Sequence, residues 1–180
     1  MNTVVSNKES SRLRFNFGFI LEGDLGTKRK MELDYPRVTI DDVILEPLKG
    51  SFQVVRGSDG LYISGELLSI IGTECARCLE SMYLPISIKL DDLFYYPPNT
   101  APLGDFGVGE DGVVDLNPLV RQLGLLEIPM KPYCRPDCKG LCDRCGQNLN
   151  NEACECETDD LDPRLESLRS LLDSKAKVED

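Results

Sequence analysis

The chain has 180 residues, of which 41% are hydrophobic, which is enough for one globular domain with an appendage or for two small units. It carries 20 Lys and Arg against 31 Asp and Glu, and its net charge of −11 argues against a surface that binds nucleic-acid phosphates everywhere. The sequence contains no histidine, which removes the commonest general base and the commonest nitrogen ligand of zinc. Residues 1–11 are polar, lack the apolar core of a signal peptide, and are predicted to be a disordered leader. No apolar run approaches the roughly 20 residues of a membrane span, so we expect a cytoplasmic protein without a membrane partner.

Residues 12–130 are predicted to form a β-rich body with antiparallel strands. Leu13, Phe15 and Phe17 alternate with polar residues, and a period of two is typical of a half-buried strand. A turn at residues 57–60 joins two strand-like runs into a predicted hairpin. The further strand-like runs cover residues 37–45, 51–56, 61–71 and 82–96. Residues 97–114 are rich in Pro and Gly and predict a long loop.

A helix is predicted near residues 116–127. Asp115 or Asn117 can cap it, Pro118 suits its first turn, and Pro129 ends it. Residues 131–158 then form a cysteine-rich module, and a last helix is expected over residues 162–174, where leucines recur at helical spacing. The predicted fold class is α+β: the β-rich body, a helix, a module resembling a zinc ribbon, and a C-terminal helix.

Eight cysteines are the strongest chemical signal, and they stand at Cys75, Cys78, Cys134, Cys138, Cys142, Cys145, Cys154 and Cys156. In a reducing compartment persistent disulfides are rare. Zinc is held by four thiolates in a structural site, and a C-x-x-C turn supplies two of them. Cys142 and Cys145, followed by Gly146, have the spacing of such a turn. We therefore predict two structural zinc ions.

The eight thiols can be sorted in two ways. In the first sorting, Cys142 and Cys145 bind one ion with Cys154 and Cys156, while Cys75 and Cys78 bind the other with Cys134 and Cys138. In the second sorting, Cys134 and Cys138 join Cys142 and Cys145, which leaves Cys75 and Cys78 to pair with Cys154 and Cys156. The first sorting would attach the module to the end of a strand.

Other uses of the thiols have less support from the residues. A thioredoxin-like C-x-x-C needs a βαβ context, whereas Cys75 follows a strand. A cysteine nucleophile needs a base such as histidine, and the chain has none. An iron–sulfur cluster uses the same ligands, so spacing leaves it open. Four thiolates leave no open coordination position, and no phosphate-binding loop is visible, so we do not expect an enzyme.

Two charged surfaces are candidates for a partner. The cysteine module carries four cations that are possible RNA contacts: Lys131, Arg135, Lys139 and Arg144. The residues after them are acidic and suit a basic protein instead: Glu152, Glu155, Glu157, Asp159 and Asp160. The two surfaces leave two kinds of partner open, an RNA or a basic protein.

Four segments carry a resemblance to a known family: C-A-R-C-L-E from Cys75, D-L-N-P-L-V-R-Q-L-G-L-L-E-I-P-M-K-P-Y-C-R-P-D-C-K-G-L-C-D-R-C-G-Q-N-L-N from Asp115, C-E-C from Cys154, and D-P-R-L-E-S-L-R-S-L-L from Asp162. Over roughly residues 10–173 the chain resembles the bacterial YceD family, called large ribosomal RNA subunit accumulation proteins, which has relatives in plant plastids. The resemblance implies a non-enzymatic role in accumulation or processing of 23S ribosomal RNA and in assembly of the large subunit. It also implies that Cys75 and Cys78 match the first C-x-x-C of the family, and that the other six cysteines match its cysteine-rich segment.

Overall fold

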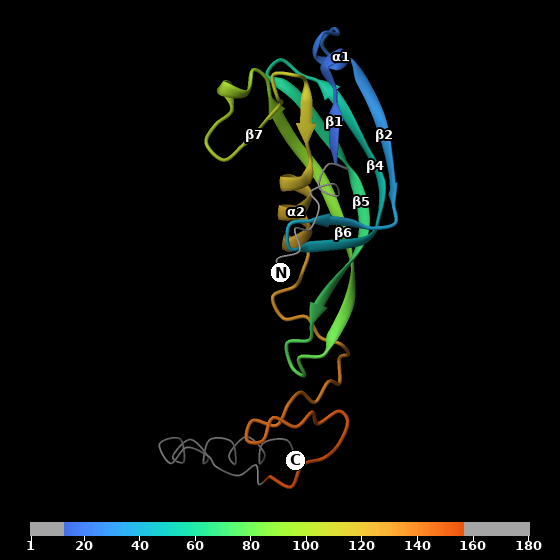
Figure 1. Ribbon diagram of the computed structural model, residues 1–180, viewed down its shortest axis with the longest axis vertical. Coiled ribbons are helices and arrows are strands. Elements are labelled where there is room, and N and C mark those ends of the chain that lie inside the picture. The colour runs from blue at the N-terminus through green and yellow to red at the C-terminus, as the bar shows by residue number, and fades with distance from the viewer. Residues whose placement is uncertain (1–12, 157–180) are drawn as a thin grey trace, which may run out of the picture.

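The computed structural model describes residues 13–156. The predicted leader at residues 1–11 and the predicted helix at residues 162–174 lie outside the described residues. Within them the chain is mostly sheet with few helices, as the sequence predicted. Figure 1 shows the long strands running along the long axis of the molecule, with the cysteine-rich segment, drawn in orange to red, beyond one end of the sheet.

A six-stranded sheet makes up most of the body. Its order is β2-β4-β5-β6-β7, and β3 pairs with β4 beside this path. All pairs are antiparallel except the short parallel pair of β6 and β7. A second, two-stranded sheet joins β1 and β8. The strands are β1 (Arg14–Asn16), β2 (Lys28–Tyr35), β3 (Val38–Ile40), β4 (Val43–Arg56), β5 (Gly60–Glu74), β6 (Ser81–Tyr95), β7 (Phe106–Gly107) and β8 (Val113–Asp115).

The hydrophobic core lies on one face of this sheet. Leu61, Ile63 and Leu67 of β5 are fully buried, whereas Tyr62, Glu66 and Leu68 are exposed on the other face, as expected for a strand with period two. Helix α2 (Asn117–Leu126) covers this inner face, where Leu119 and Val120 are buried. The opposite face of the sheet is called the outer face below. Two short helices complete the fold of residues 13–156: α1 (Gly18–Leu21) and the 3-10 helix η1 (Pro98–Thr100).

Two expectations for the strands need correction. Residues 37–45 do not form one strand, because the chain turns at Asp41, whose φ is 51°, and β3 then folds back on β4 with Val38 opposite Leu45. Aspartate tolerates this left-handed conformation better than most residues. Strand β2 was missed altogether, because six of its eight residues are charged or tyrosine and Leu33 is its one buried side chain.

The predicted loop at residues 97–114 contains η1, β7 and β8. These short elements depend on distant partners. Phe106 stacks on Phe94 with the ring centroids 5.3 Å apart, and Val114 of β8 lies opposite Phe15 of β1. Local sequence rich in Gly and Pro gives no sign of such contacts.

Helix α2 lies within the range that the sequence predicted. The carboxylate of Asp115 accepts a 2.9 Å hydrogen bond from the backbone N–H of Asn117, which satisfies one of the free N–H groups of the first turn. The chain leaves α2 at Glu127 and continues through Pro129 into the cysteine-rich segment. No helix in residues 13–156 is long and apolar enough to cross a membrane.

Candidate metal centres

The eight thiols lie in two groups of four. The first thiol group is Cys75, Cys78, Cys134 and Cys138; the second thiol group is Cys142, Cys145, Cys154 and Cys156. Within each group all the sulfur atoms lie within 4.8 Å of one another. These two groups are the ones that the first of the two sortings predicts. That the groups bind metal stays a prediction.

Strand β5 and the β5–β6 turn position half of the first group. Cys75 directly follows the last residue of β5, and Cys78 lies in the turn before β6. Cys134 and Cys138 come from the segment after α2, so this group joins parts of the chain about 60 residues apart. Cys75, Cys78 and Cys138 are buried, whereas Cys134 is exposed.

The two C-x-x-C turns have the same backbone hydrogen bonds. The N–H of Cys75 donates to the carbonyl of Glu80, and the N–H of Leu79 donates to the carbonyl of Cys75. In the second turn Cys142 donates to Gln147, and Gly146 donates to Cys142. Leu79 and Gly146 occupy the same place in the two turns, and both have a positive φ, of 59° and 73°.

This shared conformation is that of a knuckle, a tight turn that would present two sulfur atoms to one metal ion. Gly146 adopts it without strain, whereas Leu79 adopts a conformation that is unfavourable for a branched side chain. Gly146 in the sequence indicated the second knuckle. Only the structure shows that the turn at Cys75–Leu79 has the same backbone conformation. In the described part of the cysteine module one isolated β-bridge joins Leu141 to Asn148, so the ribbon-like detail stays a prediction.

The distances between sulfur atoms suit a tetrahedral ion. Cys75 Sγ lies 3.8 Å from Cys138 Sγ, and Cys78 Sγ lies 3.7 Å from Cys134 Sγ. Four sulfur atoms each about 2.3 Å from one zinc ion at the tetrahedral angle are about 3.8 Å apart. A disulfide would need about 2.05 Å, and all eight cysteines are free thiols. The residues of the first group therefore fit a zinc ion.

The turns also favour thiolates at particular positions. Backbone N–H groups, first that of Cys78, lower the pKa of Cys75 to about 6. The N–H groups of Cys145 and Arg144 lower the pKa of Cys142 to about 7. Conversely, a hydrogen bond with the Cys145 side chain, together with burial, raises the pKa of Cys156 to about 12.

The pattern of the thiol pKa values has an electrostatic origin. Four adjacent thiolates repel one another, so some thiols keep their protons when no cation is present. A bound divalent cation would supply the missing positive charge and displace those protons. With four sulfur ligands it would have no open coordination position, and its role would be structural.

Asn150 links the two groups. Its side-chain nitrogen donates to the sulfur of Cys138 at 3.4 Å, although it belongs to the loop between the ligands of the second group. Its side-chain oxygen accepts hydrogen bonds from the Arg135 side chain and from the backbone N–H of Lys139, each at 2.9 Å. Asn150 is not among the site residues that the sequence predicted. The signal available in the sequence was the N-L-N-N run that follows the knuckle.

Arg77 ties the first knuckle to the segment after α2. Its guanidinium donates to the carbonyl of Cys138 at 2.8 Å and lies 4.6 Å from the centroid of the Tyr133 ring. Its carbonyl accepts a hydrogen bond from the N–H of Leu141 at 3.1 Å. Asn148 adds a 2.9 Å bond to Glu80. The cysteine-rich segment is therefore held to the end of the sheet by hydrogen bonds as well as by the thiol group.

We expect Asn150→Ala to lower the zinc affinity of the first thiol group by about tenfold or more, because residues that hydrogen-bond to metal ligands commonly contribute 10–100-fold. Competition with a chromogenic chelator would measure this affinity. Asn151→Ala is the matched control, since Asn151 is exposed and contributes a backbone bond to Asn148. Equal affinities of the two variants would contradict the role given to Asn150.

The four predicted RNA-contact cations are all exposed. Arg135 is also part of the scaffold, because it binds Asn150 and lies 3.7 Å from Asp137. Lys131, Lys139 and Arg144 lie on the same segment. Their exposure makes them accessible to a partner, and their contact with RNA stays a prediction.

The fold and the thiols together define a protein with a curved antiparallel sheet and two four-cysteine centres at one end of it. A family model described as "Large ribosomal RNA subunit accumulation protein YceD" matches residues 63–172, which include both thiol groups. The chain belongs to the YceD family, as its motifs indicated.

The chain is also similar to individual proteins, one of which carries the family name. An uncharacterized protein of Mycobacterium tuberculosis (strain ATCC 25618 / H37Rv) is 35% identical over 120 residues, which cover 64% of this chain and 57% of the relative. "Large ribosomal RNA subunit accumulation protein YCED homolog 1, chloroplastic" of Arabidopsis thaliana is 27% identical over 176 residues, 81% of this chain and 53% of the relative. Uncharacterized protein YlbN of Bacillus subtilis (strain 168) is 32% identical over 112 residues, 61% of this chain and 63% of the relative. The chain thus spans little more than half the length of the first two. No solved structure matches it significantly.

Proposed function

We propose that this protein is a non-enzymatic, cytoplasmic factor for the accumulation and processing of 23S ribosomal RNA and hence for assembly of the large ribosomal subunit. The observation that supports this most is the family match, which spans the end of the sheet and both thiol groups. The name of the Arabidopsis thaliana relative points to the same process.

Zinc has a structural role in this proposal. Two ions, one in each thiol group, would hold the cysteine-rich segment in the conformation described above. The knuckle turns, the sulfur separations of 3.7 and 3.8 Å and the lowered pKa values of Cys75 and Cys142 support this assignment. The same donors would also hold iron, so metal analysis of the purified protein has to name the element.

A second candidate function is an acidic, zinc-stabilised module that holds a basic ribosomal protein, with an indirect effect on the RNA. The net charge of −11 favours it, because such a chain repels RNA at long range and attracts basic proteins. The two candidates differ in whether the exposed cations of the cysteine module contact phosphates.

One complementation experiment tests the function and separates the candidates. Depletion of the protein is expected to lower 23S ribosomal RNA relative to the small-subunit RNA, and the wild-type gene should restore it. Unchanged 23S levels after depletion would overturn the proposed function. A variant with Lys139→Glu and Arg144→Glu should fail to restore 23S RNA if these residues bind phosphates, and should restore it if the protein holds a basic partner.

A further inference from the structure

We propose that the outer face of the sheet carries a groove for a basic and apolar segment of a partner polypeptide. This inference deepens the second candidate function and rests on it, and it assigns the contact to a surface different from the acidic stretch after Glu152. Three features support it: two adjoining hollows, exposed apolar side chains, and the charge of the residues that line the first hollow.

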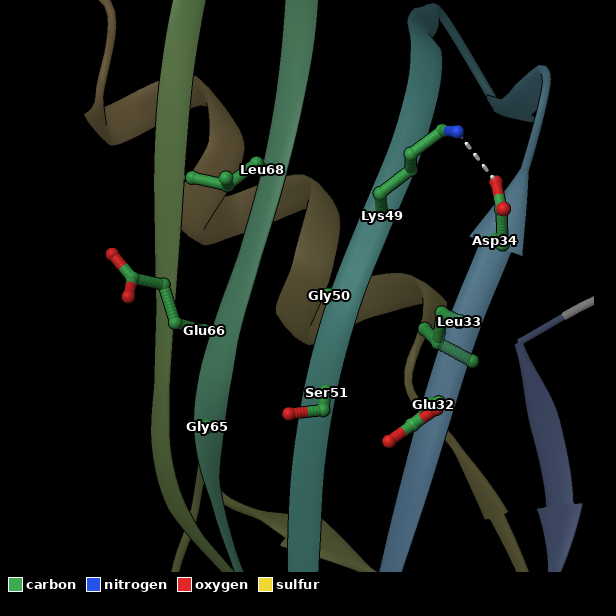
Figure 2. Close-up of a pocket in the computed structure, with 9 residues that line it drawn as sticks. All are labelled: Glu32, Leu33, Asp34, Lys49, Gly50, Ser51, Gly65, Glu66 and Leu68. Atoms are coloured by element: carbon green, nitrogen blue, oxygen red, sulfur yellow. Dashed lines mark ion pairs between the residues drawn. The ribbon is translucent and has the colours of Figure 1, made fainter.

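The groove begins at a hollow of about 700 Å³ over β2, β4 and β5. Figure 2 shows it from the outer side, with α2 passing behind the sheet. The backbone of Gly50 and Gly65 forms part of its floor. A Cβ at Gly65 would lie 2.4 Å from the carbonyl oxygen of Ser51, and one at Gly50 would lie 2.2 Å from that of Glu66, so no larger residue fits either position.

A second hollow of about 420 Å³ continues the groove along β5. It shares Lys49 and Leu68 with the first. Pro47 and Pro85 flank it on the neighbouring strands, and the register between β4 and β5 shifts between Leu45 and Leu48. A bulge with an extra residue interrupts the pairing of the strands, which explains a depression at this point of the sheet.

Apolar side chains line the groove and remain exposed. Leu68 is 56% exposed and Ile70 is 38% exposed on the outer face of β5. Tyr83 of β6, opposite Gly72 of β5, is 81% exposed, and Ile44 of β4 is 42% exposed. Ile44, Ile70 and Tyr83 line a third hollow of about 730 Å³, and Leu68 lines the second hollow together with Ile70. A cluster of large exposed apolar residues on one face is typical of a protein-binding surface.

The charge of the residues that line the first hollow favours a basic partner. Three carboxylates, Glu32, Asp34 and Glu66, line the first hollow against one ammonium, Lys49. Lys49 is already paired with Asp34 at 3.0 Å, as the dashed line in Figure 2 shows. Lys30, outside the lining, lies 3.5 Å from Glu32. Glu66 accepts a hydrogen bond from Ser87.

A segment that fits this groove carries Lys or Arg near Glu32 and Glu66 and apolar residues over Leu68, Ile70 and Tyr83. A phosphate backbone would meet a net negative lining at the first hollow, which disfavours RNA there. The partner class is therefore a basic protein with apolar residues beside its cations.

The test uses the full zinc-loaded chain and overlapping synthetic peptides that cover the basic proteins of the large ribosomal subunit. Binding by fluorescence anisotropy should select peptides that combine Lys or Arg with apolar residues, and the affinity should fall as salt rises. Leu68→Asp should weaken binding about tenfold or more, as expected for a central interface residue. Leu25→Asp is the matched control, because Leu25 is 71% exposed and lies outside the groove.

Absence of binding by any peptide, binding only of acidic peptides, or equal affinity of the Leu68→Asp and Leu25→Asp variants would overturn the proposal.

A photoreactive group in place of Tyr83 gives a second readout in cells: cross-links to a basic protein support the proposal, and cross-links mainly to RNA or to a second copy overturn it. If 23S RNA falls on depletion while no peptide binds, the groove inference fails and the proposed function stands. If peptides bind while depletion leaves 23S RNA unchanged, the proposed function fails instead.

Discussion

Cys75→Ser is expected to remove about one zinc ion per chain and to release the cysteine-rich segment from the sheet. Cys75 is fully buried, directly follows β5, and its sulfur lies 3.8 Å from that of Cys138. Binding of a structural zinc ion stabilises a folded peptide by on the order of 10 kcal/mol, because the unfolded chain has no preformed site. Loss of one ligand should therefore lower the stability of this region by several kcal/mol. Elemental analysis and limited proteolysis near residues 128–133 would measure the two effects.

Cys142→Ser is the matched variant in the second thiol group. It should also remove about one zinc ion, yet leave thermal unfolding of the β-rich body nearly unchanged, since no ligand of this group adjoins a strand of the sheet. Loss of both ions from Cys75→Ser alone would show that the groups form one cooperative unit through contacts such as Asn150 with Cys138. Zinc below one ion per chain in the wild type, with disulfides present, would contradict both expectations.

Gly65→Val is expected to destabilise the sheet by about 3 kcal/mol or more, the upper range for an overpacked site. The added Cβ would lie 2.4 Å from the carbonyl oxygen of Ser51 and 2.5 Å from the Cα of Phe52. Both are backbone atoms of the neighbouring strand, so β4 and β5 would have to separate. Denaturant unfolding followed by circular dichroism would measure the change in the free energy of unfolding.

Gly72→Val on the same strand is the control. Its Cβ would meet only the ring edge of Tyr83, at 3.9 Å, and valine favours strands over glycine. We therefore expect a neutral or slightly stabilising effect. Similar destabilisation by the two substitutions would mean that the close approach of β4 and β5 at Gly65 does not limit stability.

The RNA-contact candidates and the groove lie on different parts of the molecule. Direct contact with RNA and capture of a basic protein can therefore be tested separately. Lys139 and Arg144 belong to the cysteine-rich segment beyond the end of the sheet, whereas Leu68 and Glu66 lie on the outer face of β5. The charge reversal and Leu68→Asp therefore test different surfaces. If the protein uses both surfaces, each change should weaken partner binding independently, because the free-energy effects of distant sites are additive.

The amino-acid sequence by itself determined the type of fold and the set of candidate metal ligands. The alternation around Leu61 and Ile63 predicted β5, since a half-buried strand needs a period of two, and Pro118 and Pro129 bounded the helix that became α2. The C-x-x-C spacing and Gly146 identified a knuckle, because a tight turn is a local property of a few residues. The same motifs were sufficient to indicate the YceD family.

Only the tertiary structure decided how distant residues combine. Both sortings of the eight thiols satisfied the spacing, and the fold brought Cys75 and Cys78 to Cys134 and Cys138 across about 60 residues. The bond from Asn150 to a sulfur atom and the pairing of strands β2 and β8 likewise depend on contacts with remote segments. The groove on the outer face was also invisible, since Leu68, Ile70 and Tyr83 look like ordinary strand residues until the packing shows which face is left uncovered. Local patterns specify turns and alternation, whereas long-range contacts are set by the packing of the whole chain.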